Sequence, residues 1–502
     1  MSPFFQHHER KFRMSEASAL VNKLWRYCKV LREDGISTMD YIEQLTFLLF
    51  LKMADEREKR AVNPEKIVPE NCSWSRLVDA DGNEILKVYG EILSTLHGQP
   101  GVLGTIFLDA KNKISKPARL RRLVIDLINK ENWSSSGVDV KGDAYEGLLA
   151  KGASDAGKSV GQYFTPRSLI AAIVEVMNPH PLDTIHDPAC GTGGFLLAAH
   201  EHVSKRIDLD LGMRQHLQTG FCSGAELVEE TARLAAMNMI LHGIVQPNSI
   251  SPIASGRDSL ASDDGKRYSM ILANPPFGTT AGESDINSDG EITKFESAIN
   301  RDDFWVSTSN KQLNFLQHIK TIMDINGKAA VVLPDNVLFE SGAGETVRKR
   351  LLDEFDLHTI LRLPTGIFYA GSVKANVLFF DKHPASESHW TKEIWFYDLR
   401  TNVHFTQKAK MMQLEHLKDF IESFKVDAFD TRIETERFRC FSYDEIIARP
   451  LTNLDIFWLK DDSLEDLFSL DTPDVIARDI KENLEAVLKE FSSIVKSLEA
   501  GN

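Results

Sequence analysis

The chain has 502 residues, of which 42% are hydrophobic and 26% charged, and its net charge is −15. A chain of this length exceeds what one hydrophobic core supports, so we expect more than one domain. The ordinary composition and the absence of a long apolar run exclude a membrane-embedded or broadly disordered protein, and the acidic charge argues against strong unaided binding to nucleic acid.

The N-terminal residues 1–18 lack the apolar centre of a secretory signal. The five cysteines are scattered without paired spacing, which indicates buried thiols rather than disulfides or a metal site. We therefore expect a cytoplasmic protein with no membrane segment and no bound metal.

Residues 15–130 repeat apolar positions at helical spacing, as in SALVNKLWRYCKVL and YIEQLTFLLFLKMADEREKR, with breaks at Gly35 and Pro64. A polar, Gly/Ser-rich connector, NWSSSGVDVKGD, follows at 132–143. These features predict an α-helical N-terminal domain over residues 1–140.

Beyond this connector, short apolar strands such as DTIHD, YSMILAN, GKAAVVLP and LHTILRLP alternate with amphipathic helices. This alternation predicts a doubly wound, mostly parallel α/β sheet in a domain over residues 141–445. The segments VKANVLFFDK and EIWFYDLR lie close together in the chain, and we predict that they pair as an antiparallel hairpin.

A glycine-rich turn lies between a strand and a helix in IHDPACGTGGFLLAAHEHV (185–203). Asp187 ends the strand, and Gly191, Gly193 and Gly194 would let the backbone approach a ligand near a helix N-terminus. The spacing is not GxGxxG, and no Lys or Ser/Thr of a phosphate-binding loop follows. A pyrophosphate or ATP ligand is therefore disfavoured.

Two further carboxylates follow the next strands. Glu226 ends the strand in SGAEL, where an acid can accept hydrogen bonds from both ribose hydroxyls, and Asp258 in GRDSL is placed to accept one from an adenine amino group. Taken singly, each acid would be interpreted as a helix cap or a turn residue. Together they predict a site for a positively charged nucleoside, which S-adenosylmethionine fits.

The fourth strand leads into NPPF, residues 274–277. The two prolines end the strand and hold a stiff turn. The Asn274 side-chain oxygen and the Pro275 carbonyl could each accept an N–H bond from an exocyclic amine, and Phe277 could stack on a base rotated out of a DNA helix. An isolated NPP would be interpreted as a structural turn with Phe277 in the core.

Residues 279–310 show no sustained period and are predicted to form a long loop, either a segment covering the substrate or a disordered one. Residues 446–502 are predicted to form a C-terminal helical segment. Its apolar positions between Ile480 and Leu498 are spaced four and three apart, which suits docking to a partner helix or packing on the chain itself. Two basic clusters, KPARLRRL (116–123) and RKR (348–350), are interpreted as solvated helix faces or, alternatively, as DNA contacts.

Six stretches together resemble the modification subunit of type I restriction–modification systems, an N6-adenine DNA methyltransferase. They are GQYFTP (161–166), DPACGTGGFL (187–196), GAEL (224–227), NPPFG (274–278), GKAAVVLPDNVLF (327–339) and LRLPTGIFYAGSVKANVLFF (361–380). The resemblance implies a seven-stranded S-adenosylmethionine-dependent methyltransferase fold. It also implies a separate specificity subunit that reads the DNA sequence, a second copy of this chain, and a restriction subunit in the full complex.

By matching motif, the resemblance implies that one stretch walls the methionine end of the cofactor, namely Gln162, Tyr163, Phe164, Thr165, Pro166 and Arg167. Thr192, Gly193 and Gly194 would pass close to the cofactor, Glu226 would hold its ribose, and the four residues Asn274, Pro275, Pro276 and Phe277 would present the adenine.

Three other functions remain open from the sequence. A stand-alone DNA methyltransferase would need a target-reading region, which this acidic chain does not show. A protein-glutamine methyltransferase also uses an NPP turn, but it would leave both terminal helical regions unexplained. A cofactor-binding scaffold without activity would have no need of Asn274 and Phe277.

Overall fold

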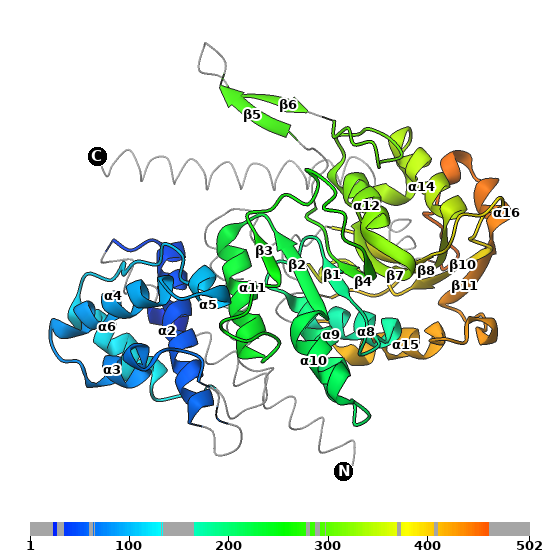
Figure 1. Ribbon diagram of the computed structural model, residues 1–502. Coiled ribbons are helices and arrows are strands. Elements are labelled where there is room, and N and C mark those ends of the chain that lie inside the picture. The colour runs from blue at the N-terminus through cyan, green and yellow to red at the C-terminus, as the bar shows by residue number, and fades with distance from the viewer. Residues whose placement is uncertain are drawn as a thin grey trace, which may run out of the picture.

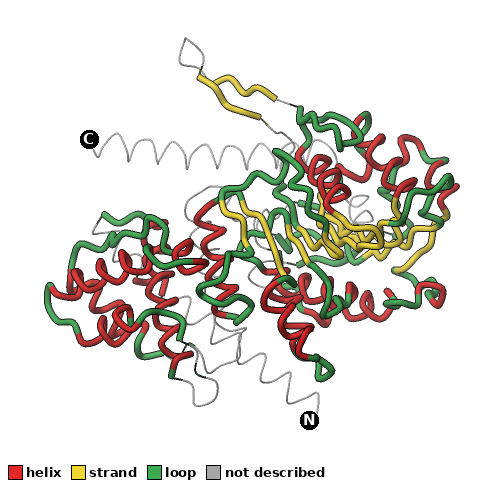
Figure 2. Tube along the Cα trace, in the orientation of Figure 1, coloured by secondary structure: helices red, strands yellow, loops and turns green. Residues whose placement is uncertain are grey.

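The computed structural model describes residues 24–27, 35–59, 64, 66–131, 133, 165–277, 282–286, 292–296, 298–368, 373–405 and 410–460. A helical region lies beside a mixed sheet that carries helices on both faces (Figures 1 and 2). The apolar seam from Ile480 to Leu498 lies outside the described residues. No helix in the described ranges is both long and apolar enough to cross a bilayer.

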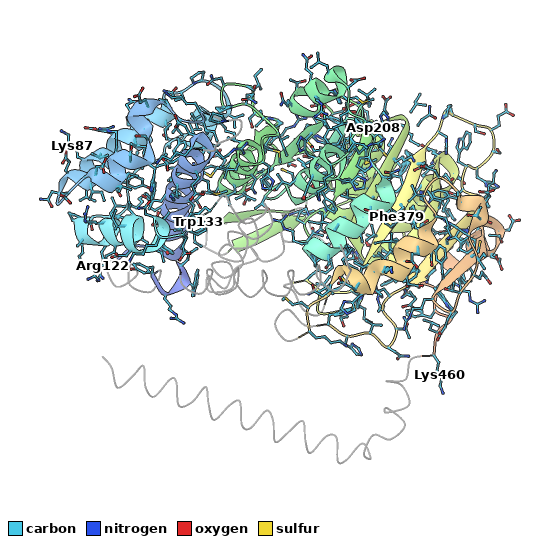
Figure 3. The ribbon with its side chains drawn as sticks, turned by 90° about the horizontal axis from the view of Figure 1, so that it is seen from below. Lys87, Arg122, Trp133, Asp208, Phe379 and Lys460 are labelled. Atoms are coloured by element: carbon cyan, nitrogen blue, oxygen red, sulfur yellow. The ribbon has the colours of Figure 1, made fainter. Side chains whose placement is uncertain are left out.

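The helical region contains a long helix, α2 (Thr38–Glu58), whose first turn is capped, because the Ser37 side chain accepts a hydrogen bond from the Asp40 N–H. Residues 24–27 before it are also helical. Trp133 closes this region by donating from its indole nitrogen to the Ile128 carbonyl at 2.9 Å (Figure 3). Its helices are α2 (Thr38–Glu58), α3 (Trp74–Asp79), α4 (Glu84–His97), α5 (Gly101–Ile106) and α6 (Pro117–Arg121), followed by a helical turn over Arg122–Ile128.

The sheet has nine strands in the order β11-β10-β8-β9-β7-β4-β1-β2-β3. The strands from β3 to β7 in this order are parallel, whereas β9 is antiparallel to both of its neighbours. Their bounds are β1 (Ile185–Asp187), β2 (Cys222–Glu226), β3 (Ile253–Ser255), β4 (Tyr268–Ala273), β7 (Met323–Pro334), β8 (Phe355–Arg362), β9 (Ala375–Lys382), β10 (Glu393–Asp398) and β11 (Phe438–Ser442).

Both faces of the sheet are buried, and successive residues of a strand enter different cores. In β7, Ala330 and Val332 contribute to the core under α8 and α9, whereas Val331 and Leu333 face the core under α12 and α14. The helices are α8 (Arg167–Met177), α9 (Gly194–Ser204), α10 (Leu211–Thr219), α11 (Glu229–Leu241), α12 (Lys311–Ile322), α13 (Asn336–Phe339), α14 (Ala343–Glu354), α15 (Lys418–Phe424) and α16 (Tyr443–Ile447). The doubly wound α/β architecture is confirmed.

The predicted pairing of 373–382 with 393–400 is wrong. β9 lies between β7 and β8, and β10 runs parallel to β8 on its far side. The apolar residues of β9 are buried on both faces, so the strand favours a central position with two neighbours over the edge of a hairpin. The seven strands from β3 to β8 in the sheet order make up the expected fold, and β10 and β11 extend it.

The segment over residues 279–310, predicted to be a loop, also differs from that prediction. It contains a two-stranded antiparallel hairpin, β5 (Gly282–Ile286) and β6 (Ile292–Glu296), which protrudes from the body of the molecule (Figure 1). Cross-strand hydrogen bonds form this hairpin without the apolar alternation that would have marked its strands in the sequence.

The helical region is attached to the sheet through α11. Arg57 in α2 donates to the carbonyls of Ile240 and Leu241 at the end of α11, and Arg233 in α11 pairs with Glu43. A continuous cluster of buried apolar side chains runs from the helical region through α11 to one face of the sheet. The two regions therefore share a core.

Gly101, at the start of α5, lets the helical region pack closely against the segment that follows α11. A substitution at this position therefore tests how much the close packing contributes to stability. Gly101 has φ +70°, and a Cβ there would lie 2.6 Å from backbone atoms of Asn248 and Ser249. We expect Gly101→Ala to lower the free energy of unfolding by about 1–3 kcal/mol. Gly90 within α4 faces open space, so Gly90→Ala is the matched control and should raise that energy by about 0.5–1 kcal/mol. Urea denaturation would measure both, and destabilisation by both changes would contradict the argument.

The basic cluster 348–350 is not simply a solvated helix face or a DNA contact. Arg348 is buried and donates to the carbonyls of Val337, Leu451 and Thr452. The segment from Leu451 to Ile456 therefore packs against the sheet domain, and Leu454 and Ile456 enter the core under α14.

Candidate active site

The carboxyl ends of the parallel strands meet at one edge of the sheet, and the residues expected to carry the chemistry follow them there. Asp187 ends β1, Glu226 ends β2, and Asn274 comes directly after β4, which is the other neighbour of β1. Ligands of doubly wound sheets bind at this edge. The structure thus brings the three residues together as expected.

The glycine-rich turn joins β1 to α9 and is fastened to β2. The Gly191 N–H donates to Glu226 Oε2 at 3.0 Å. Gly193 caps α9 with φ +84°, and a Cβ there would lie 2.8 Å from the Met239 side chain, while one on Gly194 would lie 3.0 Å from Ile170. The positive φ favours glycine at 193, and at 194 a larger residue would require Ile170 to shift slightly. The cofactor contacts expected of Thr192, Gly193 and Gly194 stay a prediction.

Asp187 and Glu226 are both buried in this turn. Burial raises the pKa of Asp187 to about 8, with a further increase from nearby Glu226, although the Ala189 N–H at 3.0 Å opposes the shift. Burial also raises the pKa of Glu226, against hydrogen bonds from the N–H groups of Val228 and Gly191. The turn therefore holds two buried carboxyl groups whose ionised form a cationic ligand would stabilise.

This raised pKa predicts a pH dependence of stability. Between pH 3.8 and about 8 the folded protein keeps the Asp187 proton that the unfolded chain releases, so this contribution to stability is lost as pH rises through that window. We expect the melting temperature of the ligand-free protein to fall more between pH 5.5 and 8.5 in the wild type than in Asp187→Asn. Asp258→Asn, at an exposed carboxylate, is the control and should behave as the wild type does. Equal pH slopes for all three proteins would contradict a raised pKa at Asp187.

Asp258 lies in the loop after β3 and is exposed, with Oδ1 accepting the Leu260 N–H at 2.9 Å. The next residue ties this loop to the glycine-rich turn, because Ser259 Oγ donates to the Pro188 carbonyl at 2.6 Å. The loop therefore lies beside the glycine-rich turn. Contact between Asp258 and an adenine stays a prediction.

Asn274 has one half of its amide satisfied. Its Nδ2 donates to Thr165 Oγ1 at 2.9 Å, whereas its Oδ1 is buried and has no hydrogen-bond partner among the described residues. A buried acceptor without a donor is costly and rare, so it indicates a group that a ligand completes. The sequence did not predict the pairing of Thr165 with Asn274.

The turn after Asn274 places the ring of Phe277 against that of a second aromatic residue, Phe368. Phe277 is partly buried and meets Phe368 edge to face, with ring centroids 5.4 Å apart. The Pro276 carbonyl accepts from Gln312 at 3.5 Å. Phe368 was not predicted as a site residue, although its position after the Pro-Thr-Gly turn of 364–366 is a signal that could have found it.

The segment expected to wall the methionine end of the cofactor is described only in part. Thr165 and Pro166 lead into α8, whose first residue is Arg167. Gln162, Tyr163 and Phe164 lie outside the described residues. Thr165 therefore connects this segment to Asn274 through one hydrogen bond.

The doubly wound sheet, the acidic turn after β1 and the unsatisfied amide after β4 define a methyltransferase that acts on an amino group. The buried carboxyl groups fit S-adenosylmethionine, because a nearby positive charge favours their ionised form. The turn also lacks the basic side chain of a phosphate site.

Comparison with known proteins specifies the family. The model of the family described as N-6 DNA Methylase matches residues 136–455, and that of the HsdM N-terminal domain matches residues 20–127. The chain is 36% identical to the type I restriction enzyme EcoKI methylase subunit of Escherichia coli K12 over 96% of both chains. The crystal structure of the EcoKI M protein aligns with TM-score 0.53 at 33% identity over 96% of both chains. A modification subunit of a putative type I restriction enzyme from Vibrio vulnificus aligns with TM-score 0.70 at 27% identity over 90% of this chain and 98% of that one.

The chain belongs to the N-6 DNA methylase family, and within it to the methylase subunits of type I restriction enzymes. It is an adenine-specific DNA methyltransferase. The resemblance seen in its sequence is confirmed.

Proposed function

We propose that this chain transfers the methyl group of S-adenosylmethionine to N6 of an adenine that has been rotated out of double-stranded DNA. The observation that carries the proposal is the buried, unsatisfied Oδ1 of Asn274 at the carboxyl end of β4. An adenine amino group would supply the missing donor.

At the cofactor end, Glu226 would accept hydrogen bonds from the ribose hydroxyls and Asp258 from the adenine amine. Thr165, Pro166 and Arg167, with Gln162, Tyr163 and Phe164 before them, would line the methionine end. When bound, the cofactor supplies an electrophilic methyl group on a sulfonium.

At the target end, the chain has to make a poor nucleophile reactive. The lone pair of an adenine amine is delocalised into the ring. Hydrogen bonds from its two N–H groups to Asn274 Oδ1 and the Pro275 carbonyl would favour a pyramidal nitrogen whose lone pair points at the methyl carbon. The cofactor would supply the methyl group and keep the electron pair of its carbon–sulfur bond, and the amine nitrogen would release one proton to solvent. Phe277 would hold the base by stacking, which is worth about 1–3 kcal/mol.

Sequence specificity would come from partner chains. The net charge of −15 disfavours unaided binding to phosphates, so a separate specificity subunit would supply DNA contacts and base recognition. A second copy of this chain and a restriction subunit would complete the assembly. We propose the division into residues 1–140, 141–445 and 446–502, with the last part docking the specificity subunit.

The proposal can be tested with a candidate specificity subunit from the organism that makes this chain. The two proteins would be purified together and incubated with S-adenosylmethionine and DNA from a strain that lacks adenine methylation. We expect N6-methyladenine at one recurrent sequence, and none when the chain acts alone at physiological salt. Methylation of cytosine or of a protein glutamine would refute the proposed substrate, and site-specific methylation by the chain alone would refute the need for a partner.

A further inference from the structure

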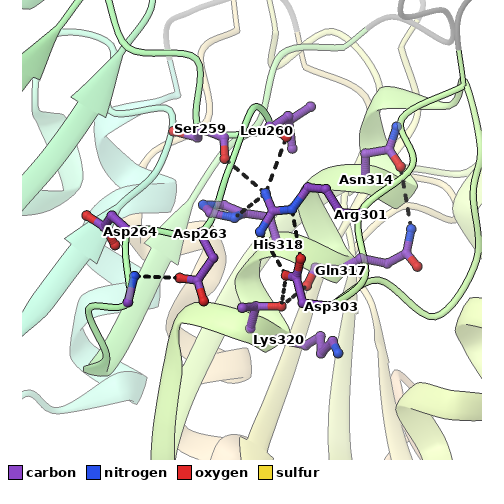
Figure 4. Close-up of polar contacts among 12 residues, drawn as sticks. Ser259, Leu260, Asp263, Asp264, Arg301, Asp303, Asn314, Gln317, His318 and Lys320 are labelled. Atoms are coloured by element: carbon purple, nitrogen blue, oxygen red, sulfur yellow. Dashed lines mark hydrogen bonds and ion pairs between the residues drawn. The ribbon is translucent and has the colours of Figure 1, made fainter.

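An ion pair with a buried guanidinium lies beside the loop that follows β3 (Figure 4). The Arg301 side chain is only 7% exposed, and it donates from Nε and Nη2 to the two carboxylate oxygens of Asp303 at 2.9 and 2.7 Å. Thr321 of α12 adds a hydrogen bond to the same carboxylate at 2.6 Å. Arg301 is thus held in one orientation from two of its nitrogens.

The remaining nitrogen of this guanidinium points at the loop that contains Asp258. Arg301 Nη1 lies 3.4 Å from the Ser259 carbonyl, 3.3 Å from the Leu260 carbonyl and 3.2 Å from His318 Nδ1 (Figure 4). Burial and the positive charge of Arg301 lower the pKa of His318 to about 4, so the ring is neutral at pH 7 and its Nδ1 accepts. One cation therefore satisfies two backbone carbonyls of this loop and one side chain of α12.

The loop is consequently held from two sides. Ser259 Oγ donates to the Pro188 carbonyl in the turn after β1, and the Ser259 carbonyl accepts from Arg301. Asp258 lies directly before this anchored residue. The same helix, α12, contacts the Pro276 carbonyl through Gln312 near its N-terminus.

We infer that Arg301 is a positioning residue for the cofactor: it holds the Asp258 loop where that loop meets the adenine ring. The inference rests on the proposed function, because it needs the adenine of S-adenosylmethionine at this loop. A buried ion pair is weak evidence for a purely stabilising role, since apolar residues of similar volume often stabilise as well. The contacts that apolar residues could not replace here are the hydrogen bonds from Arg301 to the two loop carbonyls.

The test measures binding at equilibrium with two ligands. Arg301→Lys keeps the charge but cannot bridge Asp303 and both carbonyls, and Asp303→Asn keeps the shape but releases the guanidinium. We expect either change to lower the affinity for S-adenosylmethionine roughly tenfold in calorimetry. This factor corresponds to the loss of about one charge-assisted hydrogen bond. The affinity for methylthioadenosine, which has the adenosine part without the methionine, should fall by the same factor. In methylation assays, the KM for S-adenosylmethionine should rise while kcat and the KM for DNA stay within twofold of the wild type.

Arg267→Lys is the matched control. Arg267 also pairs with an aspartate through two nitrogens, at 3.0 and 2.9 Å from Asp263, but it donates to no carbonyl of residues 258–260. It should leave both affinities unchanged. Unchanged affinities in Arg301→Lys and Asp303→Asn would overturn the inference, as would weaker binding of S-adenosylmethionine with unchanged binding of methylthioadenosine. A wild-type protein that fails to bind either ligand would instead overturn the proposed function.

Discussion

Replacing Asn274 with alanine is expected to lower the rate of adenine methylation about a hundredfold or more while leaving the affinity for S-adenosylmethionine unchanged. The change removes a preorganised acceptor for the reacting amine, and loss of one such group typically costs 10²–10³ in rate. The folded protein should not lose stability through the Oδ1 atom, because that atom has no partner among the described residues. Single-turnover kinetics of the assembled enzyme, with calorimetry for the cofactor, would measure both quantities.

Two companion variants separate the acceptor from its support. Asn274→Asp keeps an acceptor at the position of Oδ1 and should retain more activity than Asn274→Ala. Thr165→Val removes the hydroxyl that accepts a hydrogen bond from Asn274 Nδ2 at 2.9 Å. The Asn274 amide would then be less well oriented, so we expect a methylation rate between those of the wild type and Asn274→Ala. If turnover of Asn274→Ala fell less than about tenfold, equivalent to roughly 1.4 kcal/mol, the role assigned to Oδ1 would be wrong.

Glu226→Ala should lower the affinity for S-adenosylmethionine about ten- to a hundredfold. A charge-assisted pair of hydrogen bonds to ribose hydroxyls is worth on the order of 1.5–3 kcal/mol. The substitution also frees the N–H groups of Gly191 and Val228, so the glycine-rich turn loses its attachment to β2. Titration calorimetry on the isolated chain would give the Kd directly.

Glu226→Gln and Glu230→Ala serve as controls. The glutamine keeps one acceptor oxygen and the volume of the side chain, so its Kd should fall between those of the wild type and the alanine variant. Glu230 is an exposed acid in the first turn of α11, and its removal should leave the Kd unchanged. An unaltered Kd for Glu226→Ala would remove this residue from the cofactor site.

Those parts of the site that depend on strand ends were predictable from the sequence. Glu226 and Asn274 each follow a short apolar run, and parallel strands bring their carboxyl ends to one edge. The prolines after Asn274 marked the end of its strand without any knowledge of its neighbours. Local patterns therefore sufficed for these residues.

Features set by contacts between distant segments were not predictable in this way. Arg301 and Arg348 have the appearance of surface residues in the sequence, yet both are buried, because carbonyls from remote loops surround them. The position of β9 between β7 and β8 likewise depends on pairing, which the apolar character of the strand does not specify. The partner of Asn274 Nδ2 is 109 residues away in the chain.

The order of the sheet constrains how the chain is completed during synthesis. β8 leaves the ribosome before β9, yet within the described sheet it reaches β7 only through β9. Until residues 375–382 are made, β8 has no strand to join and exposes apolar edges that favour pairing with other chains. A nascent chain stalled between these two strands would therefore be prone to aggregation even though the parallel part of the sheet, from β3 to β7, is already present.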